Sequence, residues 1–209
     1  METLGITGGI GSGKSYVCHL LAQHYGIPVY DCDTEAKRLN EESPAIRKAL
    51  IKLMGPEVFD ASGHLNKPLL ASYLFASEEH QATINAIIHP IVRQDFETWR
   101  LRQGDTPVVA LESAILLESG FSQLADKIIC VTAPLEVRIQ RTMQRDASTR
   151  QQVESRIARQ ISEEERIKAS HHVIHNDGRD LMAQLQQILV HHTRLTSTVT
   201  PKETNVHII

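Results

Sequence analysis

Gly8-Gly9-Ile10-Gly11-Ser12-Gly13-Lys14-Ser15 matches the phosphate-binding loop pattern Gly-x-x-x-x-Gly-Lys-Ser/Thr. Glycines permit positive φ and close approach, so successive backbone N–H groups can turn toward phosphate oxygens beside the positive end of the following helix. The ammonium of Lys14 is expected to neutralise the β and γ phosphates, and the hydroxyl of Ser15 to ligate Mg²⁺. The stretch therefore predicts binding of a nucleotide polyphosphate.

The residues around this loop follow the order that such a site needs. Leu4–Thr7 is a short β-competent run, and apolar residues from Val17 to Leu21 recur at helical spacing until Gly26 ends the helix. A glycine-rich turn that binds nothing is the alternative. The order of strand, loop and helix makes that alternative the weaker one.

A second strand and a long helical segment are predicted next. Ile27–Tyr30 is typical of a strand, and it places Asp31 and Asp33 at its carboxyl end, where open α/β sheets bind ligands. From Glu35 to Gln103 the pattern is helical. We expect helices at Ala45–Met54, at Pro68–Phe75 with Asn66 as cap, and at Glu78–Arg102 with a break at Pro90.

Strand patterns then resume. Val108–Leu111 ends on Glu112, Lys127–Val131 follows, and both are almost continuously apolar, as in parallel strands buried on both faces. A helix is expected after each, the second one with Pro134 in its first turn. A third run, Val173-Ile174, precedes the turn Asn176-Asp177-Gly178 and a last helix from Leu181 to Leu189.

This alternation predicts an α/β fold of the P-loop NTPase type. It would be a doubly wound parallel sheet of about five strands with an inserted helical substrate lobe and an arginine-bearing lid. We expect a single kinase domain over residues 1–195, with the core at about 1–34 and 105–195, the acceptor-binding insertion at about 35–104 and the lid at about 141–166. Residues 196–209 are expected to form a flexible tail.

Composition narrows the class of partner. The 209 residues are 41% hydrophobic and 22% charged, with a formal net charge of −3 and no dense Lys/Arg stripe, so no nucleic-acid partner is expected. The three cysteines are odd in number and lack a Cys-x-x-Cys pair, which fits a reducing, cytoplasmic location. We expect no export signal and no membrane span. The partner is then a small molecule, and the chain a monomer or weak homo-oligomer.

Among phosphate-loop proteins, a small-molecule kinase is favoured because no Asn-Lys-x-Asp guanine reader is present. Such a kinase needs a carboxylate beside the acceptor hydroxyl. Asp33 could orient or deprotonate that hydroxyl, and Asp31 could support it or bind magnesium through water. A helix N-cap is an equally good interpretation of Asp33 from spacing alone.

Two further clusters contain residues that could bind a ligand. Arg138, Arg141 and Arg145 recur at three and four residues, so they are expected to project from one helical face and clamp phosphates, although a solvated charged face is the simpler alternative. The histidines of 171–175 lack a carboxylate or cysteine at ligand spacing, so metal binding there is disfavoured.

Several motifs in this order resemble those of the dephospho-coenzyme A kinase family. The resemblance runs up to about Leu189. Its carriers are Leu4–Ser15, Asp31-Cys32-Asp33, Ile88-His89-Pro90, Leu116–Gly120, Gln140-Arg141 to Arg145-Asp146, Arg156–Gln160 and Ile174–Gly178.

The resemblance implies transfer of the γ-phosphoryl group of ATP to the ribose 3′-hydroxyl of dephospho-coenzyme A, with Mg²⁺. It implies Asp33, Lys14 and Arg141 as catalytic residues, and Ser15 and Glu112 at the metal. The substrate would contact Thr7, Asp31, Asp33, His89 and Arg93. The nucleotide would contact Gly9, Gly11, Ser12, Gly13, Lys14, Ser15, Tyr16, Arg145, Asn176 and Gly178.

The chain departs from the family pattern at several positions. Tyr16 stands where the family usually has Thr, Glu112 where it has Asp, Ala114–Glu118 where it has Pro-Leu-Leu-Phe-Glu, and Ser170-His171 where it has Ala-Asp. None of these is Lys14, Ser15, Asp33 or Arg141. A kinase of a nucleoside monophosphate or another small molecule stays open as an alternative, as does a regulatory module that senses ATP without transferring phosphate.

Overall fold

The computed structural model describes residues 1–190, which form two compact units. The sheet unit contains Met1–Tyr30 and the chain from Gln103 onward, and the helical unit contains Asp31–Arg102. The final helix expected at Leu181–Leu189 is present, whereas the tail expected at 196–209 lies outside the described residues.

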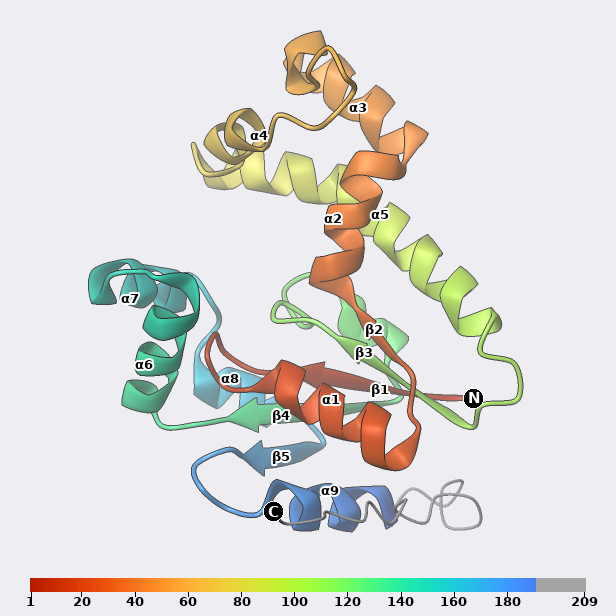
Figure 1. Ribbon diagram of the computed structural model, residues 1–209, viewed down its shortest axis with the longest axis vertical. Coiled ribbons are helices and arrows are strands. Elements are labelled where there is room, and N and C mark those ends of the chain that lie inside the picture. Colours follow the sequence, from red (N-terminus) through yellow and green to blue (C-terminus); the bar gives the residue numbers. More distant parts are fainter. Residues whose placement is uncertain (191–209) are drawn as a thin grey trace, which may run out of the picture. The chain divides into compact units, whose positions relative to one another are not determined.

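The sheet unit is built on parallel strands (Figure 1). Within the described residues one sheet has five strands in the order β2-β3-β1-β4-β5, and its β1–β3, β1–β4 and β4–β5 pairs are parallel. The strands are β1 (Glu2–Thr7), β2 (Val29–Asp31), β3 (Val108–Glu112), β4 (Lys127–Thr132) and β5 (His172–His175). The expected α/β architecture of about five strands is confirmed.

Alternation along the central strand assigns the two faces of the sheet. Leu4 and Ile6 are fully buried in one core cluster with apolar residues of α1 (Lys14–Tyr25) and α9 (Leu181–Val190). Gly5, which has the opposite parity, faces Leu116 and Ala125. Both faces of β1 are therefore covered, as the continuous apolar pattern indicates.

The connection after β3 differs from expectation. No α-helix lies between β3 and β4; turns at 114–120 lead to the short 3-10 helix η2 (Phe121–Leu124). Gly120 has φ of 73°, a left-handed conformation that ends a turn and does not continue a helix. This short stretch still buries Leu116 and Phe121. The burial of these two side chains therefore fixes the connection between β3 and β4, although it contains no α-helix.

After β4 the chain forms α6 (Leu135–Asp146), and Pro134 is its N-cap and not the first-turn residue that was expected. The polar, arginine-rich stretch that follows contains two short helices, α7 (Arg150–Ala158) and α8 (Glu163–Lys168). Each begins with a capping box, in which Thr149 and Ser162 are the N-caps. This charged stretch therefore forms helices, and capping boxes satisfy the N–H groups at the helix N-termini.

The helical unit contains α2 (Cys32–Glu42), α3 (Pro44–Met54), the 3-10 helix η1 (Pro56–Val58), α4 (Lys67–Leu74) and α5 (Glu78–Leu101). Asn66 caps α4 as expected. The break expected at Pro90 is wrong, because α5 continues through this residue. Pro90 and Ala86 are exposed, so the carbonyl that loses its partner faces water, while Ile84, Val92 and Phe96 hold the opposite side in the core.

Candidate active site

The phosphate-binding loop, residues 8–15, connects β1 to α1 in the sheet unit. Gly13 is the N-cap of α1, with φ of 95°, and no side chain caps this helix. The first turn of α1 contains no acidic residue, so its N–H groups are left for an external anion such as a phosphate. Gly13 also has no room for a side chain, because a Cβ there would overlap the Asn176 amide.

Asn176, which the resemblance assigns to the nucleotide, and Arg141, which it assigns to catalysis, both lie beside this loop. The Asn176 side-chain amide donates to the Ser12 carbonyl at 2.9 Å, and Arg141 Nη1 donates to the Asn176 carbonyl at 3.4 Å. Arg141 is exposed, and Gly178 follows in the same turn with φ of 105°. The loop after β5 is therefore fastened to the phosphate loop, with one cation at its side.

Ser15 and Glu112 form a polar pair at the carboxyl ends of the strands. The Ser15 hydroxyl donates to Glu112 Oε1 at 2.9 Å, and Glu112 is 7% exposed. A hydroxyl and a carboxylate are hard oxygen ligands, which Mg²⁺ prefers, and Mg²⁺ usually takes only one or two of them from the protein. The residues present fit this ion, and Glu112 supplies the carboxylate where the family usually has Asp.

Two other predicted residues flank the loop. Thr7, the last residue of β1, is fully buried, and within residues 1–190 its hydroxyl has no hydrogen-bond partner. Tyr16 is 56% exposed in the first turn of α1. Burying a hydroxyl without a hydrogen-bond partner lowers the stability of the fold. The Thr7 hydroxyl is therefore a polar group next to the loop that could bond a ligand.

The three arginines of α6 do not share one open face, which corrects the expectation. Arg138 is only 4% exposed, with Nε donating to the Ile10 carbonyl and Nη1 paired to Glu163. Arg145 pairs with Asp146, Nε to Oδ1 at 2.7 Å, and this contact and a second one from Arg156 lower the pKa of Asp146. Of these three arginines, Arg141 is therefore the one that is exposed and also contacts Asn176 beside the loop.

Sequence reasoning missed the role of a second residue at the loop. Gln160 Oε1 accepts from the Ile10 N–H at 2.9 Å, across 150 positions of sequence. Gln160 lies between α7 and α8. Its presence in the run Arg156–Gln160, quoted above for the resemblance, was the available signal.

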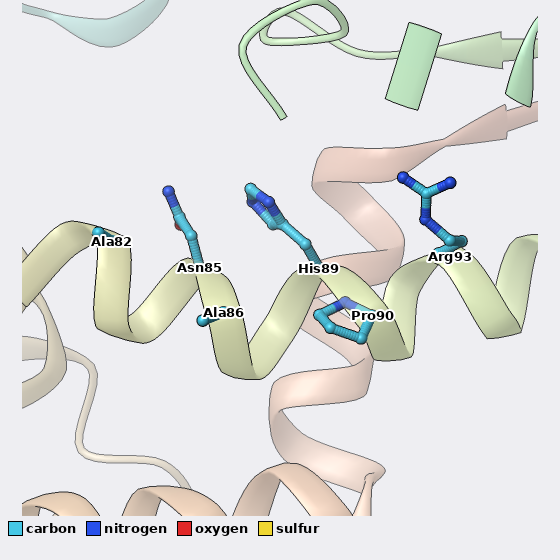
Figure 2. Close-up of a pocket in the computed structure, with 6 residues that line it drawn as sticks. All are labelled: Ala82, Asn85, Ala86, His89, Pro90 and Arg93. Carbon is cyan, nitrogen blue, oxygen red and sulfur yellow. The ribbon is translucent and has the colours of Figure 1, made fainter. Parts of the chain in front are cut away.

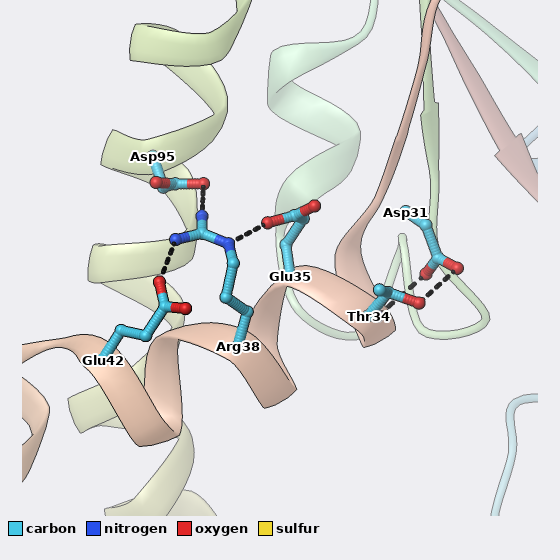
Figure 3. Close-up of polar contacts among 6 residues, drawn as sticks. All are labelled: Asp31, Thr34, Glu35, Arg38, Glu42 and Asp95. Atoms are coloured by element: carbon cyan, nitrogen blue, oxygen red, sulfur yellow. Dashed lines mark hydrogen bonds and ion pairs between the residues drawn. The ribbon is translucent and has the colours of Figure 1, made fainter.

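In the helical unit, the two aspartates at the start of α2 have different roles (Figure 3). Asp31 is the N-cap: its Oδ1 accepts from Asp33 N at 2.9 Å and Thr34 N at 3.1 Å, and its Oδ2 accepts from the Thr34 hydroxyl at 2.8 Å. Asp33 lies in the first turn and is exposed. The N-cap interpretation of Asp33 is therefore wrong, because Asp31 fills that position.

Arg38 links α2 to α5 through three carboxylates, as Figure 3 shows. It pairs with Glu35 at 2.6 Å, with Glu42 at 3.0 Å and with Asp95 of α5 at 2.8 Å. The hydrogen bonds to Glu35, then Glu42 and Asp95, raise the pKa of the guanidinium. The helix that presents Asp33 is in this way tied to α5.

A surface pocket on α5 carries the other predicted acceptor residues (Figure 2). Asn85, His89 and Arg93 project to the same side of the helix. Burial, and then the nearby Arg93, lower the pKa of His89, so its imidazole is neutral at pH 7. The lining is completed by Ala82, Ala86 and Pro90. Small apolar groups beside a cation and an amide suit an acceptor with both apolar and phosphate parts.

The parallel sheet and the glycine-rich loop between β1 and α1 define a P-loop nucleotide-binding fold. The family model for dephospho-CoA kinase matches residues 2–181, so the chain belongs to the dephospho-CoA kinase family. Curated relatives agree. A dephospho-CoA kinase of Bacteroides fragilis is 46% identical over 89% of this chain and 90% of its own, and one of Porphyromonas gingivalis is 42% identical over 90% and 93%.

Solved structures support the same fold. A Thermus thermophilus protein aligns with a TM-score of 0.79 at 35% identity over 91% of this chain and 97% of its own. Dephospho-CoA kinase from Campylobacter jejuni aligns at 0.65 and 21% identity, over 93% and 98%. Shikimate kinase from Acinetobacter baumannii, at 0.52 and 15% identity over 92% and 93%, shares the fold alone.

Within residues 1–190, no helix combines the length and the apolar character needed to cross a bilayer.

Proposed function

We propose that this chain transfers the γ-phosphoryl group of ATP to the ribose 3′-hydroxyl of dephospho-coenzyme A, giving coenzyme A and ADP. Membership of the dephospho-CoA kinase family, matched over residues 2–181, carries the proposal. The uncapped N-terminus of α1 and the Ser15–Glu112 pair support it, because they suit a polyphosphate and its cation.

On the donor side, the loop binds the phosphates through backbone N–H groups and the Lys14 ammonium. Ser15 and Glu112 hold Mg²⁺, which neutralises charge on the β and γ phosphates when bound. Arg141 stabilises the transferring group, and its contact with the Asn176 carbonyl supports a place beside the loop. The remaining nucleotide contacts are Gly9, Gly11, Ser12, Gly13, Tyr16, Arg145, Asn176 and Gly178.

On the acceptor side, Asp33 is the base. It accepts the proton of the 3′-hydroxyl while the hydroxyl oxygen attacks the γ phosphorus and ADP leaves. Its exposure supports this role, and so does the Asp31 cap, which holds the first turn of α2 in place. His89 and Arg93 bind the coenzyme A portion through the α5 pocket, and Thr7 completes the substrate contacts.

The two units bind different substrates. The helical unit is the acceptor-binding lobe, and residues 141–166 are a lid that closes over the nucleotide. The enzyme acts in the cytoplasm, as a monomer or weak homo-oligomer, on a small-molecule substrate.

The test is to incubate the purified chain with Mg-ATP and dephospho-coenzyme A and to look for the mass gain of one phosphate on the acceptor. Lys14→Ala is the matched inactive control, because it removes the cation at the transferring phosphates. Product only with nucleoside monophosphates would favour another acceptor. Calorimetric ATP binding without turnover on any acceptor would instead favour a regulatory module.

A further inference from the structure

The Ile10 backbone, in the middle of the phosphate loop, is held from both sides by side chains. Its N–H donates to Gln160 Oε1 at 2.9 Å, and its carbonyl accepts from Arg138 Nε at 3.1 Å. These two groups belong to the peptides before and after Ile10. Both peptide planes are therefore fixed by residues of the segment that contains α6, α7 and α8.

Burial and an ion pair hold the Arg138 side chain in the position that makes this contact. Its side chain is 4% exposed, and its Nη1 is paired to Glu163, the first residue of α8. A buried guanidinium needs such a partner, since removing one member of a buried pair leaves the other uncompensated. The planar fork of arginine serves the carbonyl and the carboxylate together, which the single ammonium of lysine cannot reproduce.

Two glycines of the loop make room for this arrangement. A Cβ at Gly9 would overlap the guanidinium of Arg138, and a Cβ at Gly11 would overlap the Arg138 carbonyl. The loop and α6 therefore approach each other closely along both residues. Gly9 and Gly11 are needed by the arginine as well as by the phosphate pattern.

Phosphate binding by backbone N–H groups works only when those groups already point inward, because turning them at the moment of reaction costs free energy. Fixing the peptides on either side of Ile10 limits how residues 9–12 can turn. The Glu163 pair in turn fixes the guanidinium. The arrangement thus joins α8 to the donor groups of the loop through one arginine.

We propose that Arg138, seated by Glu163 and acting with Gln160, is a positioning residue that sets the phosphate loop for nucleotide binding. This rests on the proposed function, because it assigns the loop to ATP. It goes beyond that function in making α8 and the preceding link, residues 159–162, part of the donor site. No direct contact between Arg138 and substrate is required.

The test compares ATP affinity, acceptor affinity and stability in three variants. Arg138→Gln and Glu163→Gln each remove the ion pair, and Gln160→Ala removes the second bond without leaving a buried charge. We expect the Kd for ATP, measured by calorimetry without acceptor, to rise about tenfold in Arg138→Gln and about threefold to tenfold in the other two. The KM for the acceptor stays within about twofold.

Arg100→Gln is the matched control, since it removes an arginine that pairs with Glu97 at 2.9 Å in the helical unit. It should leave both constants unchanged. Arg138→Lys, which keeps the charge and loses the fork, should recover less than half of the lost ATP affinity on a logarithmic scale.

Each outcome has a distinct meaning. Lower thermal stability with unchanged Kd for ATP in Gln160→Ala and Glu163→Gln would show a structural role alone and overturn the proposal. Gln160→Ala keeps the test valid even where Arg138→Gln fails to fold. A wild-type chain that binds no ATP would instead refute the proposed function, which the calorimetry reveals before any variant is compared.

Discussion

The phosphate loop and the start of α2 present their functional groups by opposite means. The backbone of Ile10 and Ser12 is hydrogen-bonded to side chains that lie 128, 150 and 164 positions away in the sequence, those of Arg138, Gln160 and Asn176. At the start of α2, the Asp31 carboxylate caps N–H groups two and three positions on. Arg38 pairs three and four positions away, with one longer link of 57 positions to Asp95.

This difference separates long-range from local control of a site. The loop geometry depends on contacts that form only when the sheet unit has folded. The first turn of α2 is set mainly by its own sequence, through a cap of the ordinary Asx kind. Changes in the helical unit should therefore alter the acceptor side and spare nucleotide binding, and four substitutions test this contrast.

Asp33→Asn should have the largest effect. Removing the base is expected to lower kcat by about a hundredfold to ten-thousandfold, because the 3′-hydroxyl loses its proton acceptor. The Kd for ATP should not change, since the loop is in the other unit and Asn leaves the Asp31 cap intact. Steady-state kinetics and calorimetry measure the two quantities. A kcat close to that of the wild type would rule out Asp33 as the base.

Glu112→Gln is expected to act on the cation. The carboxylate that accepts the Ser15 hydrogen bond becomes a neutral amide, so the Mg²⁺ concentration for half-maximal rate should rise about tenfold to a hundredfold. Rates titrated against Mg²⁺ at fixed ATP provide the measurement. Glu97→Gln, in the helical unit, is a control of the same chemistry. An unchanged Mg²⁺ dependence would place the ion elsewhere.

Arg38→Gln should be milder and should affect stability. The variant leaves Glu35, Glu42 and Asp95 without their shared cation, but the Arg38 side chain is 40% exposed, so solvent screens the loss. We expect the free energy of unfolding to fall by about 1 kcal/mol. Urea unfolding measures it. A rise in the Kd for ATP would contradict the separation of the two units.

His89→Gln should have the smallest effect, visible as a change in pH dependence. Burial and Arg93 lower the pKa of His89, so the unfolded chain binds a proton more readily than the folded one. Stability due to His89 is therefore present above the ordinary histidine pKa and is lost as the pH falls through and below it. The variant should lose less stability than the wild type between pH 7 and 5. Parallel curves would show that His89 is not perturbed.

The sequence was sufficient wherever the determining residues are close together. The loop spacing, the apolar strands and the Asn66 cap need only local information, and the structure confirms them. The missing helix after β3 and the unbroken α5 depended on packing that propensity rules do not include.

Arg138 was misread for a related reason. Its helical spacing predicted an exposed clamp, but its partners Ile10 and Glu163 are 128 and 25 positions away. The distinction between Asp31 and Asp33 was finer. It turned on a shift of two residues in where α2 begins, which is within the usual uncertainty of a helix boundary.

Gly9 has a consequence for how mutational scans of this protein are interpreted. Loss of nucleotide binding in Gly9→Ala would ordinarily be ascribed to a methyl group crowding a phosphate. Here the methyl group meets the guanidinium of Arg138, so the same loss would report displacement of that side chain. Attempts to alter nucleotide preference at this position should therefore vary residues 9 and 138 as a pair.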